Sequence, residues 1–309
     1  MPPRFSKDAL SPRLEWSAID PRYLDQLIAW AQAEDLTGLG FKQRPAHAFD
    51  ISSDYISQRT ENQASAAIIA REACVLCGLK LIHSILKAYD TKLSFHPSAT
   101  DGDSLEKGGL IGRIEGPAAS LLQAERVLLN FLQHLSGIAS LTQCFTDCLK
   151  GSKTRLLDTR KTTPLYRVLE KYAFVCGGGY NHRYGLYDRI MIKDNHWATL
   201  TSKPDAPALE AIQQLRQDYP ELPMHIEVDH FDQIEHALNA GADCILLDNF
   251  TLDGLEQAVD QIGNRAYTEA SGGIQFEDLN ALKMLGLDFI STGAPVHRSP
   301  WIDIGIDWL

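Results

Sequence analysis

Polar side chains follow the ends of several short apolar stretches in the second half of the chain, and their types indicate a site for an anionic ligand. The stretches are residues 155–159, 189–193, 224–229, 243–248, 266–271 and 288–292. The groups at their ends are Arg160 with Lys161, Lys193, Glu227 with Asp229, Asp248, Ser271 with Gly272 and Gly273, and Thr292 with Gly293. No single one of them requires a functional explanation, but together they predict one shared site.

Helical patterns at 208–218, 231–240 and 276–285 lie between several of these stretches. A repeated strand-helix order predicts a parallel sheet, either open or closed into a barrel. In a barrel the C-terminal ends of the strands build the active site. We therefore expect the polar groups to meet at one mouth.

The segment from 151 to 193 is basic although the protein is acidic. It contains nine Lys and Arg residues and three Asp and Glu residues, a net charge of +6, whereas the whole chain has 29 basic and 40 acidic residues. A basic run is commonly a solvated face, and that interpretation stays open. Basic residues that directly follow a strand and lie beside glycines favour an anion pocket. So compact a patch suits a small, multiply charged ligand better than nucleic acid, which needs a broad positive surface.

The composition places limits on the class of protein. A chain of 309 residues, 44% hydrophobic and 22% charged, is typical of a soluble globular protein with one large or two ordinary domains. No apolar run reaches the roughly 20 residues of a membrane span, and no secretory signal opens the chain. The six cysteines suggest no disulfide framework. Cys74 and Cys77 form a lone CxxC pair, for which buried free thiols are favoured over a zinc or redox site. We expect a cytoplasmic location.

The first half of the chain predicts an α+β sandwich. A helix is expected over 20–36, no regular structure over 38–48, and strands at 66–70, 74–76, 93–96 and 110–114. The alternating tail WIDIGIDWL predicts a strand that returns to this sheet. We therefore assign residues 1–130, with 294–309 returning to them, to an N-terminal sandwich domain, and residues 131–293 to a catalytic barrel domain.

Two further helices are expected. The first runs from Ala118 to about Leu149 with an interruption near Ser136-Gly137, and its apolar surface on nearly all sides requires cover from the barrel and from a second subunit. The second begins at Pro164, which suits a first helical turn, and ends before Gly177.

Several motifs resemble the quinolinate phosphoribosyltransferase family. They are LLDTRKTTP, GGGYNHRYGLYD, IKDNH, IEVD, LLDNF, EASGGI and STGAPVHRS, and matches at ERVLLNFLQHLSGIASLT, DISSDYI, REACVLCGL and DIGIDW extend the resemblance to nearly the whole chain. The resemblance implies an N-terminal sandwich, a C-terminal open barrel, and a homodimer or higher oligomer with shared active sites. It also implies transfer of the phosphoribosyl group of phosphoribosyl pyrophosphate to the ring nitrogen of quinolinate, with loss of carbon dioxide, in NAD biosynthesis.

The same resemblance implies roles for individual residues. Those expected to bind quinolinate are Arg160, His182, Arg183, Lys193 and, from a partner subunit, Arg126. Those expected to bind phosphoribosyl pyrophosphate are Lys161, Glu227, Asp248, Ser271, Gly272, Gly273 and Gly293. Lys161, Glu227 and Asp248 are the expected catalytic residues, and the two carboxylates are also expected to hold Mg²⁺, directly or through water. Guanidinium forks suit a dicarboxylate, and Mg²⁺ takes few carboxylates besides phosphate oxygens.

Some of these residues have simpler interpretations. His182 could be a packed loop histidine, Asp248 could cap the following helix, and Arg126 could pair with Glu125 or Glu115.

The chain also departs from the family pattern at two places. Residues 37–49 form an extra loop before the DISSDYI motif. His225 occupies a position where the family commonly has a glutamate, two residues before Glu227, and a side chain facing the barrel interior there would change the local charge.

Three other functions remain open at this stage. The first is a relative within the wider family that acts on nicotinate or another aromatic acid, including the molybdenum-associated branch. The second is a phosphate-binding barrel used as an aldolase or isomerase. The third is a metabolite-binding protein without turnover. The intact NHR and KDNH motifs favour a dicarboxylate, and no catalytic group of the family is missing.

Overall fold

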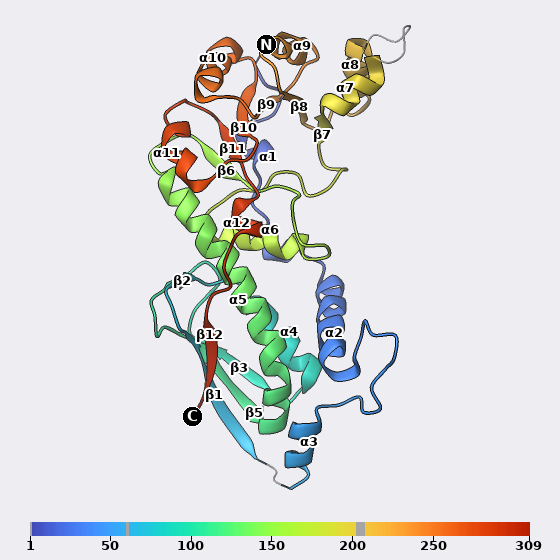
Figure 1. Cartoon of the computed structure of the whole chain (residues 1–309), viewed down its shortest axis with the longest axis vertical. Helices are drawn as coiled ribbons and strands as arrows, with labels where there is room; N and C mark the ends of the chain where they lie inside the picture. The colour runs from blue at the N-terminus through green and yellow to red at the C-terminus, as the bar shows by residue number, and fades with distance from the viewer. Residues whose placement is uncertain (1, 60–61, 202–207) are drawn as a thin grey trace. The chain divides into compact units, whose positions relative to one another are not determined.

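The structure, a computed structural model, describes residues 2–59, 62–201 and 208–309, which fall into two compact units (Figure 1). One unit contains residues 15–141 and 299–309, and the other contains residues 2–14 and 142–298. The sequence alone predicts boundaries at 130 and 293 and places all N-terminal residues in the first domain. Residues 2–14 instead belong to the barrel unit, because Leu10 is buried against Leu157, Cys244 and Phe289.

The first unit is built on an antiparallel sheet in the order β12-β1-β5-β3. Its strands are β1 (Gln63–Ala70), β3 (Ser94–Pro97), β5 (Leu110–Pro117) and β12 (Ile304–Trp308). The C-terminal strand pairs with β1 from Ala66 opposite Trp308 to Ala70 opposite Ile304, so the predicted return of the tail to this sheet is confirmed. A separate two-stranded sheet joins β2 (Cys74–Val75) and β4 (Ser104–Leu105).

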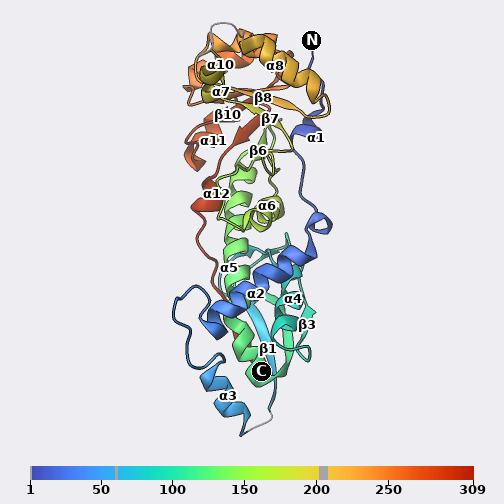
Figure 2. The same ribbon diagram turned by 90° about the vertical axis from the view of Figure 1, so that its right-hand side faces the viewer.

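Helices complete this unit. After a short 3₁₀ turn, Trp16–Ala18, helix α2 (Pro21–Thr37) begins where the Asp20 side chain accepts a hydrogen bond from the Arg22 N–H, and it ends at Gly38, as predicted. Helices α3 (Ile51–Ser57) and α4 (Leu79–Tyr89) were not predicted. Figure 2 shows α2 and α4 beside the sheet. Residues 38–50 contain no helix or strand.

The long helix α5 (Ala118–Cys148) is continuous, so the predicted interruption near Ser136-Gly137 is wrong. A Cβ at Gly137 would lie 2.0 Å from the Pro300 carbonyl oxygen. The glycine therefore lets the returning tail approach the helix closely and does not break it.

The second unit is an open barrel of six parallel strands in the order β6-β11-β10-β9-β8-β7. The strands are β6 (Arg155–Leu157), β7 (Ile190–Ile192), β8 (Met224–Val228), β9 (Cys244–Asp248), β10 (Tyr267–Ser271) and β11 (Phe289–Ser291). Each of them lies within a predicted stretch. Among the described residues the edge strands β6 and β7 are not paired with each other, so the barrel is open. The predicted fold class is confirmed.

The helices of this unit connect or follow the strands. They are α1 (Lys7–Leu10), α6 (Arg167–Cys176), α7 (Asp194–Thr201), α8 (Ala208–Asp218), α9 (Gln233–Asn239), α10 (Leu252–Ile262), α11 (Leu279–Leu282), preceded by the 3₁₀ turn Phe276–Asp278, and α12 (Ala294–His297). The predicted start of α6 at Pro164 is wrong. Leu165 has φ +66°, in the left-handed region, which cannot continue a right-handed helix.

Cys74 and Cys77 are buried thiols outside any disulfide, and burial raises the pKa of Cys74 to about 11. The expectation of structural thiols is confirmed for this pair. Among the described residues, no helix has the length and apolar character needed to cross a membrane.

Candidate active site

A cavity of about 590 Å³ lies at the C-terminal ends of the barrel strands. Eleven of the twelve predicted site residues line it: Arg160, Lys161, His182, Arg183, Lys193, Glu227, Asp248, Ser271, Gly272, Gly273 and Gly293. Strand register explains this convergence. Glu227 lies opposite Leu246 and Ser271 lies opposite Asp248, so these side chains share one face of the sheet.

Two arginines, Arg160 and Arg183, give the cavity a positive region. Burial and the nearby charge of Arg160 lower the pKa of Arg183 from its usual value. The Nε of Arg160 is buried and has no hydrogen-bond partner among the described residues. A buried unpaired donor is unfavourable, and two like charges repel each other. An anionic ligand bound here would accept a hydrogen bond from the Arg160 Nε and would reduce the repulsion between the two arginines.

Lys193 is already engaged. Its Nζ lies 2.5 Å from Oε2 of Glu227, and 42% of the lysine side chain and 14% of the glutamate side chain are exposed. A ligand carboxylate that binds Lys193 must therefore share the ammonium group with Glu227 or displace it.

Glycines form the wall of the cavity beside strands β10 and β11. Gly272 has φ +96°, and a Cβ there would lie 2.3 Å from Oδ1 of Asn249. A Cβ at Gly293 would lie 2.6 Å from Nε2 of His297. At Gly272 a side chain would also lie 2.6 Å from the Asn249 backbone nitrogen, so the backbone itself forms the wall there, whereas at Gly293 the His297 ring would have to move. Backbone N–H groups in such a loop suit phosphate oxygens.

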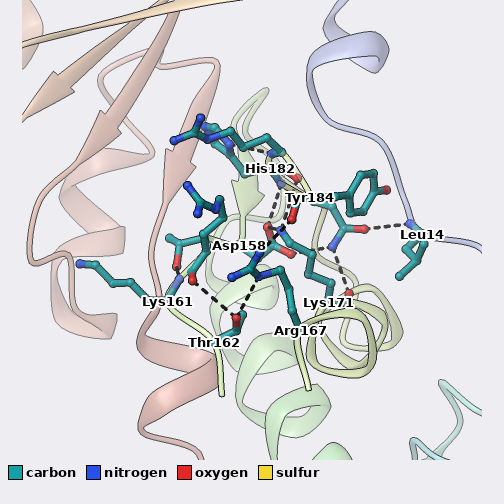
Figure 3. Close-up of polar contacts among 12 residues, drawn as sticks. Leu14, Asp158, Lys161, Thr162, Arg167, Lys171, His182 and Tyr184 are labelled. Atoms are coloured by element: carbon teal, nitrogen blue, oxygen red, sulfur yellow. Dashed lines mark hydrogen bonds and ion pairs between the residues drawn. The ribbon is translucent and has the colours of Figure 1, made fainter. Parts of the chain in front are cut away.

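A buried ion pair fixes the loop formed by residues 181–183 (Figure 3). The Asp158 carboxylate accepts hydrogen bonds from Lys171 Nζ at 2.5 Å, Asn181 Nδ2 at 2.6 Å and the His182 N–H at 2.8 Å. The side chains of Asp158 and Lys171 are each only 1% exposed. The Leu14 N–H donates to Oδ1 of Asn181 at 2.8 Å, which ties the N-terminal segment to the same loop. These hydrogen bonds hold in place the loop that carries the cavity residues His182 and Arg183.

The simpler interpretations can now be compared with the geometry. Thr251, not Asp248, caps helix α10, since its side chain accepts a hydrogen bond from Gly254. His182 is a packed histidine, 6% exposed, and it also lines the cavity.

Arg126 is the predicted site residue that does not line this cavity. It belongs to the first unit and is exposed. Its guanidinium makes no hydrogen bond or ion pair within the described parts of the chain, so the proposed pair with Glu125 or Glu115 is absent there. Its predicted role stays a prediction.

The sequence prediction missed several cavity residues, among them Asp158, Glu269, His297 and Arg298. The histidine and arginine follow the last barrel strand in the STGAPVHRS motif, a signal that was available. Burial and the charges of Lys161 and Arg298 lower the pKa of His297, which shows that cations gather on this side too. Asp158 directly follows strand β6 and Glu269 lies inside strand β10, and a carboxylate buried at such a place is itself a signal of a functional position.

A parallel barrel that brings cations, carboxylates and a glycine cradle to one cavity defines an enzyme that acts on small anionic substrates. Residues 50–136 match the family described as quinolinate phosphoribosyl transferase, N-terminal domain, and residues 138–307 match its C-terminal domain. The chain belongs to the quinolinate phosphoribosyltransferase family.

Individual relatives agree with this assignment. The chain is 41% identical over 248 residues, 80% of its length, to a probable nicotinate-nucleotide pyrophosphorylase [carboxylating] of Bacillus subtilis, of which 84% is covered. It is 34% identical over 260 residues to a quinolinate phosphoribosyltransferase [decarboxylating] of Nicotiana tabacum, with 79% of this chain and 73% of that protein covered. The structure of the nicotinate-nucleotide pyrophosphorylase from Francisella tularensis superposes with a TM-score of 0.85 at 29% identity, covering 96% of this chain and all of that one.

Proposed function

We propose that this protein transfers the phosphoribosyl group of phosphoribosyl pyrophosphate to the ring nitrogen of quinolinate and releases carbon dioxide. The products are nicotinate mononucleotide and pyrophosphate, and the reaction belongs to NAD biosynthesis. One observation carries the proposal: in a chain of this family, the predicted cations and carboxylates of the barrel line a single cavity.

Quinolinate has two carboxylates on adjacent ring carbons. The forked guanidiniums of Arg160 and Arg183 and the ammonium of Lys193 suit this dianion, and the unpaired Nε of Arg160 supplies a donor for it. In this proposal His182 is the fourth residue of the barrel that binds quinolinate. Because three cations surround the site, a dicarboxylate is favoured over the monocarboxylate nicotinate.

Phosphoribosyl pyrophosphate occupies the other side of the cavity in this proposal. Ser271, Gly272, Gly273 and Gly293 hold its 5′-phosphate with backbone N–H groups, and Lys161 binds the pyrophosphate. Glu227 and Asp248 contact the ribose hydroxyls. The small number of carboxylates, on neighbouring strands and on one face of the sheet, also fits Mg²⁺, which prefers a few carboxylates together with phosphate oxygens. Bound there, Mg²⁺ would neutralise charge on the leaving pyrophosphate.

The chemistry needs no nucleophilic side chain, because the ring nitrogen of quinolinate attacks the ribose. Positive charge develops on the sugar as pyrophosphate leaves, and the carboxylates of Glu227 and Asp248 stabilise it, while Lys161 stabilises the leaving group. The bond between C2 and its carboxylate then breaks, and the electron pair stays on C2, where the adjacent cationic ring nitrogen stabilises it. C2 next takes up one proton, supplied by solvent, which gives nicotinate mononucleotide. The site has to orient the carboxylate and keep bulk water away until that bond has broken.

The experiment that tests the function compares two acids. Quinolinate and nicotinate are each supplied with phosphoribosyl pyrophosphate and Mg²⁺, and pyrophosphate release and product mass are measured. We expect turnover of quinolinate, its loss on chelation of the metal, and its return when Mg²⁺ is added. Preferred turnover of nicotinate would assign the chain to the alternative, a related phosphoribosyltransferase.

The proposal includes a homodimer in which Arg126 of one subunit completes the site of the other. Its support is that the exposed guanidinium of Arg126 makes no hydrogen bond or ion pair with any described residue, and that the family resemblance assigns it to the site of a partner subunit. The cytoplasmic location stays a prediction from the sequence.

The shared site predicts complementation between inactive variants. Arg126→Ala and Arg160→Ala should each be nearly inactive, and an equal mixture, unfolded and refolded together, should recover about a quarter of wild-type activity. Random assembly makes half of the dimers mixed, and each mixed dimer has one intact site of two. Activity is measured before and after mixing, with mixed but not refolded variants as the control. If refolding together restores nothing although mixed dimers form, the sites are not shared.

A further inference from the structure

Four buried polar side chains lie in a row that begins below the cavity and ends in its lining, which includes Glu269 and His182. Arg189 NH1 is 3.1 Å from His225 Nε2, His225 Nδ1 is 3.4 Å from Glu269 Oε2, and Glu269 Oε1 is 3.4 Å from His182 Nε2. Their exposed fractions are 4%, 0%, 0% and 6% in that order. His225 and Glu269 precede Glu227 and Ser271 by two residues on their strands, so they face the same side, one layer deeper.

The hydrogen-bond partners determine the proton positions on His225. A guanidinium has donors and no acceptor, so Nε2 of His225 must accept from Arg189. That nitrogen therefore holds no proton, and the one proton of the neutral ring is on Nδ1, which faces Glu269.

The same reasoning applies to His182. The backbone N–H of Arg183 donates to its Nδ1 at 2.7 Å, so that nitrogen holds no proton. Burial lowers the pKa of His182, and its proton lies on Nε2, directed at Glu269. The carboxylate thus faces the protonated nitrogen of each imidazole at 3.4 Å, although neither contact has the geometry of a hydrogen bond. Burial alone would raise the pKa of Glu269, but the two rings stabilise the anion and hold that pKa well below its ordinary value.

This arrangement argues against a metal ion at the same place. The potential ligand atoms of His182, His225 and Glu269 lie within 4.8 Å of one another, which is close enough for a metal site. A metal would need the lone pairs of His182 Nε2 and His225 Nδ1, and both atoms carry the protons that face Glu269. The row instead connects a buried cation, Arg189, with a buried anion, Glu269, through a neutral ring.

We infer that Glu269, supported by His225 and Arg189, is a positioning residue that fixes the tautomer and the orientation of His182 in the substrate cavity. His182 then offers a neutral ring, and the charge that binds the dianion comes from Arg160, Arg183 and Lys193. The kinetic consequence of this inference depends on the proposed function, whereas its spectroscopic consequence does not.

The spectroscopic test uses ¹⁵N NMR of histidine-labelled protein, with the His182 signals assigned by their loss in His182→Asn. Near neutral pH we expect Nδ1 of His182 to be unprotonated and Nε2 to be protonated. In Glu269→Gln a single amide oxygen can accept from only one ring and the NH₂ group faces the other, so the His182 pattern should change. Glu269→Asp keeps the charge and should retain the wild-type tautomer. A wild-type His182 that is protonated on Nδ1 overturns the inference, even if the Glu269→Gln protein does not fold.

The kinetic test compares kcat/KM for quinolinate. We expect Glu269→Gln to lose about 10- to 100-fold, the range found for carboxylates that orient metal-binding histidines and taken here as a guide, and Glu269→Asp to regain part of it. The control is Glu277→Gln, which makes the same change at an exposed glutamate outside the cavity and should leave kcat/KM unchanged. A folded Glu269→Gln protein with wild-type kcat/KM and His182 signals overturns the inference. A wild-type protein without turnover would refute the proposed function instead, and the NMR result would still decide the inference.

Discussion

Replacement of Arg160 by alanine is expected to weaken quinolinate binding by about 2–5 kcal/mol, the usual loss when one partner of a desolvated charge pair is removed. This corresponds to a dissociation constant about 30- to 5000-fold higher. The reason is local: Arg160 contributes to the cavity a buried Nε that has no hydrogen-bond partner among the described residues, and it lies close enough to Arg183 to lower its pKa. Removing the side chain takes away both a charge and the fork that matches a carboxylate.

The measurement is calorimetric titration of quinolinate, with thermal unfolding recorded in parallel. Arg160→Lys keeps the charge without the fork and should fall between alanine and the wild type. Arg265→Ala is the matched control, since Arg265 pairs with Glu235 on the surface of the same unit and does not line the cavity. Near-normal titration by a folded Arg160→Ala protein would contradict the assigned quinolinate site.

Breaking the buried ion pair beneath the 181–183 loop is the second large effect that we expect. Asp158→Asn leaves the Lys171 ammonium buried without its counter-charge, and Lys171→Met leaves the carboxylate in the same state. Each change should lower the free energy of unfolding by about 3–5 kcal/mol. The double variant removes both charges, so it should be clearly more stable than the sum of the two losses implies.

Urea unfolding of the wild type, both single variants and the double variant measures this coupling. The control is Asp147→Asn, which removes the exposed pair with Lys150 and should change stability by about 0–1 kcal/mol. Additive losses in the double variant would show that the two charges do not depend on each other. Wild-type stability of Asp158→Asn would show that the carboxylate does not hold the loop.

The parallel strands and their polar ends could be predicted from the sequence because both signals are local. A strand buried on both faces is a continuous apolar run, and a polar cluster marks its end, as at Asp248 and Lys193. The pocket follows from this, since parallel strands end on the same side of the sheet. For the same reason the prediction brought eleven of twelve site residues into one cavity.

The errors arose where distant parts of the chain decide the local structure. In the sequence Gly137 resembles a helix breaker. In the structure its lack of a side chain allows the backbone of Pro300 to lie against the helix. Pro164 resembles a helix start, yet Leu165 takes a left-handed conformation that no local pattern announces. Residues 2–14 join the barrel because Leu10 is buried there, a contact between segments more than 100 residues apart.

The row of buried side chains formed by Arg189, His225, Glu269 and His182 could not be predicted from the sequence. His225 was noted as a departure from the family pattern, but its partners Arg189 and Glu269 come from different strands and loops, and only the register of the sheet brings them together. The structure answers the question of local charge. His225 is neutral, and the charged group that faces it on the cavity side is Glu269.

The most direct test of the central claim follows each carboxylate of the substrate separately. Quinolinate labelled in either the 2- or the 3-carboxylate is incubated with the wild-type protein, phosphoribosyl pyrophosphate and Mg²⁺, and labelled carbon dioxide, pyrophosphate and nicotinate mononucleotide are quantified. The account predicts that carbon dioxide, pyrophosphate and nicotinate mononucleotide form in equal amounts. It also predicts that the carbon dioxide carries label only when the 2-carboxylate was labelled. Absence of carbon dioxide, or release of label from the 3-carboxylate, would contradict it.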